Sequence, residues 1–129
     1  MQIIGLGTDI VEISRVQEVL ANFPGRFQER VYTPAEVVQG EERRNKVSYF
    51  AGRWAAKEAC SKALGCGIGE ACGFTDIEIL NNAKGTPVMQ LSGAALGTAK
   101  TLGVDRIMLS ISHENHYAVA TVILCGKDD

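Results

Sequence analysis

An alanine-rich segment from about Asn45 to Leu64 limits the possible folds of this chain more than any other part of the sequence. At helical spacing, the apolar residues of this segment fall on two sides. Val47, Ala51 and Trp54 form one side, and Tyr49, Ala56, Ala59 and Ala63 form the other. Gly65 follows, and glycine readily takes the left-handed conformation in which many helices end. A helix that is apolar on two sides needs packing partners on both, so we expect it to lie at the centre of the fold.

Shorter segments on either side of this helix give strand and helix signals in turn. β-Branched residues favour a strand over residues 2–12. Two further strands are predicted over residues 74–80 and 87–91, with a turn between them. A closing hairpin is predicted over residues 106–112 and 117–124. Capping boxes predict helices that start at Ser14 and at Thr33, and residues 93–102 favour another helix. The pattern predicts one α+β domain over residues 1–129, in which a mostly antiparallel sheet packs on the long central helix.

Charge is unevenly distributed along the chain. Residues 43–62 carry six Lys or Arg and one acid, which gives this segment a net charge of +5, although the whole chain has a formal charge of -2. The overall charge predicts no binding to nucleic acid or to membranes. The basic segment, in contrast, is expected to attract anions.

The cysteines and the chain start indicate where the protein works. Cys60, Cys66, Cys72 and Cys125 form no C-x2-C pair, so we expect reduced and largely buried thiols; a metal cluster is the alternative. The first residues lack the features of a secretion signal, and no stretch reaches the roughly 20 apolar residues that span a bilayer. A cytoplasmic location is therefore expected.

Glu58 lies on the same side of the long helix as Val47, Ala51 and Trp54, where a core residue is expected. An ionised carboxylate at such a position needs a positive partner. Lys62, one turn later, offers an ordinary ion pair that is worth only about a few tenths of a kcal/mol. A bound cation is the alternative that gives Glu58 a function.

Asp9 is a second acid in an unexpected place. On a strand over residues 2–12 it shares one face with Gly5 and Gly7, because side chains alternate between the two faces. Glycines inside a strand often allow a ligand or another backbone to approach closely. A bulge that places Asp9 in a turn is the structural alternative. The two glycines are not a dinucleotide fingerprint, because no third glycine and no helix follow at the required spacing.

Two carboxylates beside several cations suit a diphosphate that is held through Mg²⁺. Magnesium prefers one or two carboxylates together with phosphate oxygens and water. Arg53, Lys57 and Lys62 would neutralise the remaining phosphate charge, on which phosphoryl transfer strongly depends. The residues alone lead to this site and no further.

Three motifs carry a family resemblance. Residues 5–15 read GLGTDIVEISR, residues 53–63 read RWAAKEACSKA, and residues 110–113 read SISH. Together and in this order they resemble the three signatures of the holo-acyl-carrier-protein synthases, which are 4′-phosphopantetheinyl transferases, and the resemblance spans nearly the whole chain.

The resemblance implies site residues, a cofactor and an assembly. It places the metal ligands at Asp9 and Glu58, with Mg²⁺ as the cofactor and coenzyme A as the co-substrate. It places Arg53, Lys62 and His113 near the coenzyme A phosphates, Ser112 among the other residues that bind coenzyme A, and Gly85, Thr86 and Pro87 at the adenine. It also implies a homotrimer with active sites between subunits.

The reaction implied is transfer of 4′-phosphopantetheine from coenzyme A to a serine of apo-acyl carrier protein, for fatty acid biosynthesis, with release of 3′,5′-ADP. Asp9, Glu58, Lys62 and His113 are the expected catalytic residues. Glu58, acting directly or through a bound water, is the first choice of base because it already lies at the metal. For His113, the alternative to a catalytic role is that of an ordinary hydrogen-bonded histidine at the end of a strand.

The acyl carrier protein is acidic, and the first helical region offers a surface that would suit it. Arg15, Arg26 and Arg30 alternate with Phe23 and Phe27, which would provide charge steering and apolar anchors. The two phenylalanines at this spacing are equally typical of an ordinary core.

Two other functions fit the same residues. The chain could be a non-catalytic module that binds coenzyme A or a nucleotide, with Asp9 and Glu58 purely structural. It could also be a metal-dependent phosphohydrolase, which would use the same acids to activate water. Only an assay of products separates these functions.

Overall fold

The computed structural model describes residues 1–128 and shows eleven elements of secondary structure in one α+β fold. The strands are β1 (Gln2–Glu12), β2 (Ile77–Asn81), β3 (Pro87–Leu91), β4 (Arg106–His113) and β5 (Tyr117–Gly126). The helices are α1 (Ile13–Asn22), α2 (Arg26–Val31), α3 (Pro34–Glu41), α4 (Lys46–Ala63), α5 (Gly93–Leu102) and a short 3-10 helix, η1 (Phe74–Asp76). The predicted fold class is confirmed.

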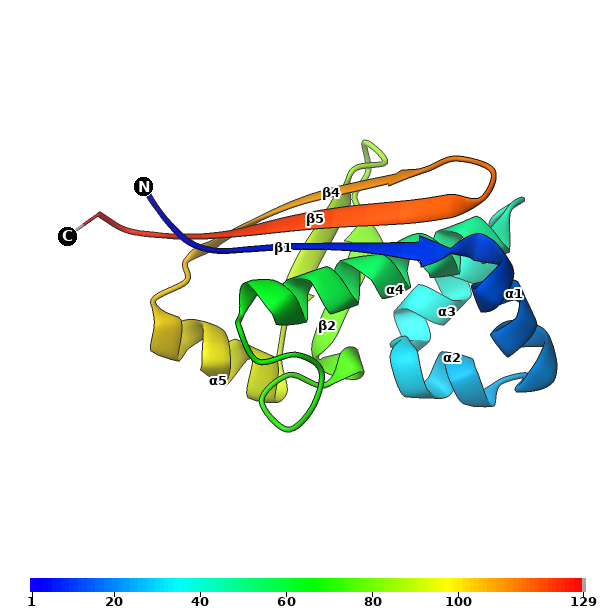
Figure 1. Ribbon diagram of the computed structural model, residues 1–129, viewed down its shortest axis with the longest axis horizontal. Coiled ribbons are helices and arrows are strands. Elements are labelled where there is room, and N and C mark those ends of the chain that lie inside the picture. Colours follow the sequence, from blue (N-terminus) through cyan, green and yellow to red (C-terminus); the bar gives the residue numbers. More distant parts are fainter. Residues whose placement is uncertain (129) are drawn as a thin grey trace.

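The strands form two antiparallel sheets. The larger sheet has the order β1-β5-β4, so β1 and β4 are its two edges, and the smaller sheet is the β2–β3 hairpin. Figure 1 shows α4 running beneath the larger sheet, with α1, α2 and α3 gathered at one end and α5 at the other. One face of the larger sheet therefore packs on α4, and no element of the described chain covers the other face.

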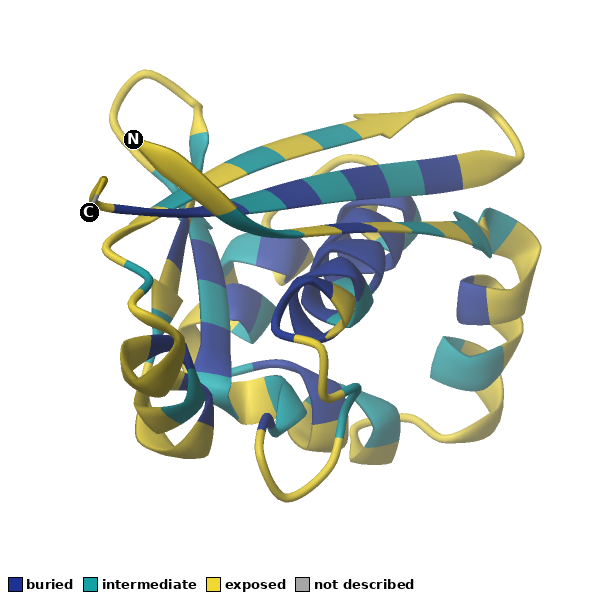
Figure 2. Ribbon diagram, turned by 60° about the vertical axis from the view of Figure 1, so that its left-hand side comes forward, coloured by how far each residue is buried: buried dark blue, intermediate teal, exposed yellow. Residues whose placement is uncertain are grey.

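The long helix lies at the centre of the fold, as its two apolar sides predict. Asn45 caps its first turn by accepting a hydrogen bond from the Ser48 amide, and Gly65 follows its end with a φ of 81°. Thirteen of its 18 residues are buried. Figure 2 shows this helix as the most continuously buried element.

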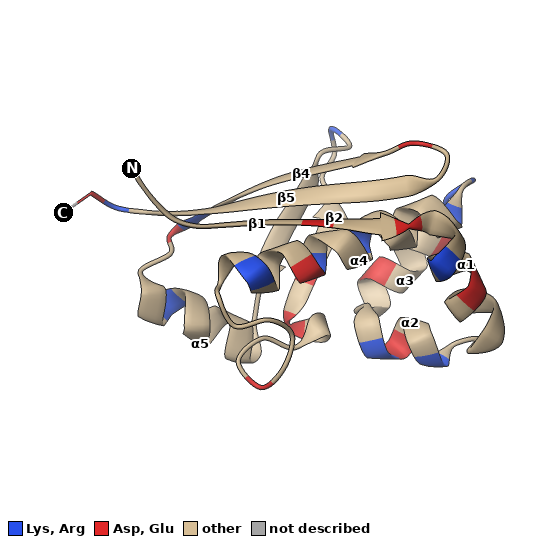
Figure 3. Cartoon of the chain, in the orientation of Figure 1, with Lys and Arg blue, Asp and Glu red and all other residues tan. Residues whose placement is uncertain are grey.

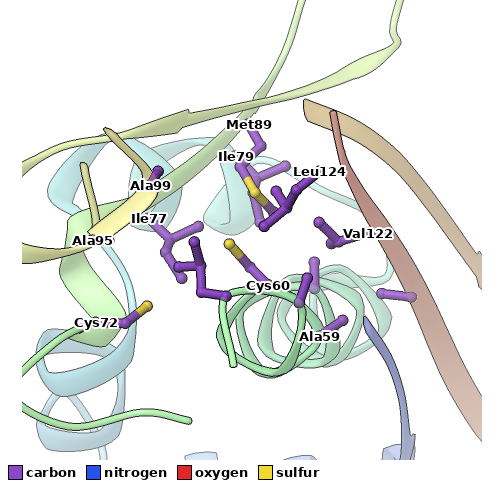
Figure 4. Packing of buried hydrophobic residues seen from close by; sticks show 14 of the residues in the cluster. Ala59, Cys60, Cys72, Ile77, Ile79, Met89, Ala95, Ala99, Val122 and Leu124 are labelled. Atoms are coloured by element: carbon purple, nitrogen blue, oxygen red, sulfur yellow. The ribbon is translucent and has the colours of Figure 1, made fainter. Parts of the chain in front are cut away.

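Small residues dominate the core where α4 meets the sheets. Figure 4 shows Ala59 and Cys60 of α4 beside Ile77 and Ile79 of β2 and Leu124 of β5. All five of these residues are fully buried. Alanine allows the sheet and the helix to come close, which explains the alanine-rich composition of this segment.

The closest contact of the fold joins β1 to α4, and glycine makes it possible. A Cβ atom added to Gly7 would lie 2.0 Å from the carbonyl oxygen of Ala59, and one added to Gly5 would lie 2.1 Å from that of Ala63. No other residue fits these two positions without moving the strand. The next residue on the same face of β1 is Asp9.

Several local predictions were wrong. Helix α1 begins at Ile13 without a side-chain cap, so the capping box predicted at Ser14 does not form, whereas the one at Thr33 does. Helix α2 was not predicted, and residues 74–76 form the 3-10 helix instead of the start of a strand. Within residues 1–128, no helix combines the length and the apolar character that crossing a bilayer requires.

Candidate functional site

Asp9, Glu58 and Lys62 form a charged cluster where β1 passes over α4. The Lys62 Nζ donates to Asp9 Oδ1 at 2.7 Å and to the carbonyl oxygen of Thr8 at 3.2 Å. Asp9 pairs with Ala120 in the regular register of the sheet, and the one irregularity of β1 lies between Ile3 and Gly5. The alternative of a bulge at Asp9 is therefore excluded. Figure 3 shows acidic and basic residues side by side along α4 beneath β1.

Glu58 is half-buried and faces Asp9 across this cluster. Burial, and then the negative charge of Asp9, raise the pKa of Glu58 above its ordinary value. Lys62 lowers this pKa only weakly, because its ammonium group is bonded to Asp9. From the sequence, an ion pair between Glu58 and Lys62 was the alternative to a bound cation. In the structure, the principal contact of Lys62 is with Asp9 instead.

The two carboxylates repel one another, because the negative charge of Asp9 raises the pKa of Glu58, and such a pair favours a cation beside it. Asp9 and Glu58 supply two hard oxygen donors, and no group of three or more His, Cys, Asp or Glu side chains within residues 1–128 could hold a metal ion. A site with only two acidic donors leaves positions for phosphate oxygens and water, which is how Mg²⁺ is usually held. The residues present thus fit magnesium and do not fit zinc, which prefers a set of Cys and His ligands.

A second charged site lies on the other side of α4. A cleft of about 350 Å³ is lined by Arg53, by His113 at the end of β4, by Asn81 at the end of β2, and by Arg43 and Arg44 before α4. We call it the anion cleft. Arg53 as a whole is only 7% exposed. Its guanidinium donates from Nη2 to Asn81 Oδ1 at 2.8 Å, and its Nε has no partner among the described residues.

The other residues predicted to bind coenzyme A lie at different places. Pro87 pairs with Asn81 in the β2–β3 hairpin, so the turn that contains Gly85 and Thr86 lies beside the anion cleft. Ser112 is exposed on the face of β4 opposite to Ile111, which lines the cleft. Ser112 therefore faces away from the cleft within one chain.

Lys57 does not join either site. Its ammonium group is fully buried and donates to Glu36 Oε1 at 2.6 Å and to the carbonyl oxygens of Val31 and Phe74 at 2.7 and 3.0 Å. The prediction that Lys57 neutralises phosphate charge was wrong. Its position in the helix gave no sign of this, because the partner acid lies 21 residues away.

The two groups of phosphate-binding candidates are separated within one chain. Arg53 precedes Glu58 by five residues and Lys62 by nine, which at helical spacing places them roughly 140° and 180° apart around α4. Asp9 and His113 correspondingly lie on the two opposite edges of the larger sheet. The structure thus does not bring Arg53 and His113 to Asp9, Glu58 and Lys62, although the sequence placed all five in one site.

The predicted docking residues form a groove beside the first of these sites. Val19, Phe23, Arg26, Phe27 and Arg30 line it, whereas Arg15 is exposed on α1 outside the groove. Phe23 is 51% exposed, but Phe27 packs edge-to-face against Trp54, with ring centroids 5.2 Å apart. Trp54 in turn lies close enough to Glu58 to lower its pKa, so the groove leads toward that carboxylate.

The sequence reading missed four cleft residues that depend on tertiary contacts. Arg43 and Arg44 were counted in the basic segment but not assigned to a site, and Tyr49 was assigned to the core. Asn81 gave no signal, because its amide reaches Arg53 only through the packing of β2 on α4.

Comparison with known proteins finds relatives over nearly the whole chain. A family model described as the 4′-phosphopantetheinyl transferase superfamily matches residues 5–122, which include the residues of both charged sites. The holo-[acyl-carrier-protein] synthase of Vibrio parahaemolyticus is 47% identical over 124 residues, which cover 96% of this chain and 98% of the relative.

Solved structures show the same fold. The holo-[acyl-carrier-protein] synthase of Neisseria meningitidis matches with a TM-score of 0.89 and 36% identity, over 95% of this chain and 98% of the other. The enzyme of Bacillus anthracis, in complex with coenzyme A (3′,5′-ADP), matches with a TM-score of 0.82 and 36% identity, over 98% and 100% of the two chains.

Proposed function

This chain belongs to the 4′-phosphopantetheinyl transferase superfamily, among its holo-[acyl-carrier-protein] synthases, and we propose that Asp9 and Glu58 hold the magnesium ion of its active site. The enzyme transfers 4′-phosphopantetheine from coenzyme A to a serine of apo-acyl carrier protein and releases 3′,5′-ADP. The observation that carries the metal assignment is the convergence of two carboxylates and Lys62 where β1 crosses α4.

The residues around this cluster suit the steps of the transfer. When bound there, magnesium would neutralise the diphosphate and stabilise charge on the leaving oxygen. Glu58 takes the proton of the serine hydroxyl, because it is the carboxylate that lies at the site of the reaction and a base must be within hydrogen-bond reach of that proton. The serine oxygen then bonds to the β-phosphorus, the bond from this phosphorus to the bridging oxygen breaks, and 3′,5′-ADP leaves. Lys62 keeps Asp9 oriented and adds positive charge.

Replacement of Glu58 by glutamine tests the role of this carboxylate. The protein is incubated with coenzyme A, Mg²⁺ and unmodified acyl carrier protein, and the carrier is weighed by mass spectrometry. We expect kcat to fall by about two to four orders of magnitude, because the amide cannot accept the proton. Full activity of the variant, with magnesium binding intact, would exclude Glu58 as the base.

The same assay separates the other two functions. A phosphopantetheine adduct on serine supports transfer, release of inorganic phosphate supports a phosphohydrolase, and binding of coenzyme A without a product supports a non-catalytic module. Asp9→Asn tests the metal assignment independently, since it should raise the Mg²⁺ concentration needed for half-maximal activity as well as lower the rate.

We further propose that three copies of this chain form a homotrimer with active sites between subunits, the assembly that the resemblance implies. Two features support this proposal. The uncovered face of the larger sheet exposes Leu6 and Ile10 of β1, each 64% exposed, and Met108 of β4, 43% exposed. A second copy on this face could also bring the two charged sites together. The anion cleft at the β4 edge of one copy, with Arg53 and His113, would then lie near Asp9 and Glu58 at the β1 edge of its neighbour.

The groove of α1 and α2 is our proposed docking surface for the acyl carrier protein. Its phenylalanines and arginines offer apolar anchors within a basic rim, and it leads through Phe27 and Trp54 toward Glu58. A carrier bound there would present its serine near the proposed base. A cytoplasmic location accompanies this function, because four unpaired cysteines suit a reducing compartment.

Charge reversal tests the docking surface. The double variant Arg15→Glu and Arg26→Glu should raise the KM for acyl carrier protein about tenfold, because two steering charges become repulsive. The KM for coenzyme A should stay nearly unchanged. An equal rise in both constants would argue for a general loss of structure instead of a docking role.

A further inference from the structure

Four side chains from three elements form a closed ring of contacts at the base of the anion cleft. Gln39 of α3 accepts hydrogen bonds through Oε1 from the Tyr49 hydroxyl at 3.1 Å and from the backbone amide of Asn81 at 3.2 Å. The Asn81 Oδ1 accepts from Arg53 Nη2 at 2.8 Å, and the Arg53 guanidinium stacks on the Tyr49 ring, 4.1 Å from its centroid. We call these residues the Arg53 ring.

Arg53 is the one charged member of this ring, and its position is fixed from two sides. Asn81 holds one end of the guanidinium, and the face of Tyr49 supports its plane. The Arg53 Nε is buried and bonds to no group among residues 1–128. A buried arginine with an unpartnered donor, in a cleft shared with Arg43 and Arg44, is arranged to bind an anion.

Tyr49 connects this arrangement to the rest of the basic cleft. The Arg43 guanidinium also lies over the Tyr49 ring, 5.5 Å from its centroid, so one aromatic ring contacts two cations. Its hydroxyl bond to Gln39 fixes the ring, and the edge of the ring packs on Phe50 at 5.3 Å between centroids. The tyrosine is only 8% exposed and has little freedom to turn.

We propose that Gln39, Tyr49 and Asn81 are positioning residues that hold Arg53 in the orientation in which it binds the phosphates of coenzyme A. An arginine side chain loses much conformational freedom when it binds a ligand, and this loss weakens binding unless the side chain is already fixed. Because the Arg53 ring already fixes this side chain in the free protein, binding of coenzyme A costs less conformational entropy. This inference rests on the proposed function of the cleft.

The first measurement tests the cleft itself. Binding of 3′,5′-ADP to the full chain is measured by calorimetry at one fixed salt concentration, for the unchanged protein and for Arg53→Ala. Weaker binding by the variant supports the cleft as the phosphate site. Unchanged binding would overturn the assignment of the cleft, and with it the inference built on it.

The second measurement tests the positioning residues separately from the cleft. Tyr49→Leu removes the ring under Arg53, and we expect about tenfold weaker binding of 3′,5′-ADP, the size of one cation–π contact in a partly desolvated site. Tyr49→Phe keeps the ring and loses only the bond to Gln39, so its effect should be smaller. Gln39→Leu loses this bond and also the bond from the Asn81 amide, so its effect should be at least as large as that of Tyr49→Phe. Gln28→Leu is the matched control, because the Gln28 amide bonds Glu41 outside the cleft and its loss should not change nucleotide binding.

A double-variant comparison distinguishes positioning from a general structural role. If Tyr49 acts through Arg53, Tyr49→Leu should weaken binding in the unchanged protein but have no further effect when Arg53 is already alanine. An equal effect in both backgrounds, or a lower Tm with unchanged binding, would overturn the proposal. Should Tyr49→Leu fail to fold, the same comparison is made with Tyr49→Phe and Gln39→Leu, which leave the ring in place.

Discussion

Burial divides the four cysteines into two chemical kinds. Cys60, Cys72 and Cys125 are buried, whereas Cys66 is exposed in the segment after α4. Burial raises the pKa of Cys60 and of Cys72 to about 12 in both cases. A thiol reacts as its thiolate, so these two side chains behave as small apolar core residues and not as nucleophiles.

Cysteine labelling checks this difference. At pH 8, a thiol with a pKa near 12 is ionised in only about one molecule in ten thousand. We therefore expect iodoacetamide to modify Cys66 alone in the folded protein, and all four cysteines after unfolding in urea. Rapid modification of Cys60 or Cys72 in the native state would show that the core opens locally.

Single residues also show what the sequence could predict about the site. Asp9 and Glu58 were identified because each acid stands in an apolar pattern, and this signal is local. The partners of Lys57 and Lys62 were not predictable, because Glu36 and Asp9 lie 21 and 53 residues away along the chain. A pattern shows that a charge needs a partner but not which distant residue supplies it.

At the scale of elements, α4 is held in place on two sides. On one side β1 lies against its backbone at Gly5 and Gly7. On the other side the Lys57–Glu36 pair joins it to α3, and Glu36 Oε2 also accepts from the amide of Ile79 in β2 at 2.8 Å. Every oxygen of this buried carboxylate has a partner, which is the condition under which a buried ion pair is tolerated.

Replacement of Gly7 by alanine tests the first of these contacts. The added Cβ would lie 2.0 Å from the Ala59 carbonyl oxygen and 2.7 Å from the Ala63 nitrogen, and both are backbone atoms that cannot turn away. We expect a loss of about 2 kcal/mol or more in the free energy of unfolding. Urea unfolding at one fixed protein concentration measures it.

Gly97→Ala is the matched control for this variant. Gly97 lies in α5 with open space around its Cα, so alanine there should stabilise the helix by about 0.5–1 kcal/mol. Equal stability of the two variants would show that β1 can shift away from α4 at little cost.

The elements that the sequence predicted well are those with a regular pattern. The central helix was predicted to within a residue or two because its spacing, its cap at Asn45 and Gly65 all agree. Helix α2, with six residues, is too short to show a period, and η1 exists because Asp76 accepts from the Gly73 amide. The division of the strands into two sheets depends on long-range pairing, which no local pattern specifies.

At the scale of the whole molecule, each chain carries two separate charged sites. The cluster of Asp9, Glu58 and Lys62 lies at the β1 edge of the sheet and the anion cleft at the β4 edge, with α4 between them. One coenzyme A needs both a metal and cations for its phosphates. The proposed trimer would meet this need by joining the two kinds of site from neighbouring copies.

Leu6→Lys tests this assembly. A lysine on the uncovered sheet face should prevent association, so light scattering should give the mass of one chain in place of three, and transfer activity should be lost. Val38→Lys is the matched control, because Val38 is 61% exposed on α3, away from the sheet. This variant should keep both the mass and the activity of the unchanged protein.

Mixing two inactive variants tests the shared site directly. Glu58→Gln lacks the base, and Arg53→Ala lacks a phosphate contact. Trimers assembled from both chains after unfolding and refolding should regain activity, because some sites then combine an intact Glu58 with an intact Arg53. Absence of any recovery in verified mixed trimers would contradict sites built from two copies.

The contact of β1 with α4 has a consequence for how this enzyme tolerates mutation. At Gly5 and Gly7 the strand rests on peptide groups, whose dimensions are the same whatever the surrounding side chains are. Changes in core volume should therefore have little effect on the distance between β1, which carries Asp9, and α4, which carries Glu58. Substitutions that repack the interior should displace the hairpins or α5 before they change the distance between the strand that carries Asp9 and the helix that carries Glu58, so the core can vary in sequence while the two acids keep their relative positions.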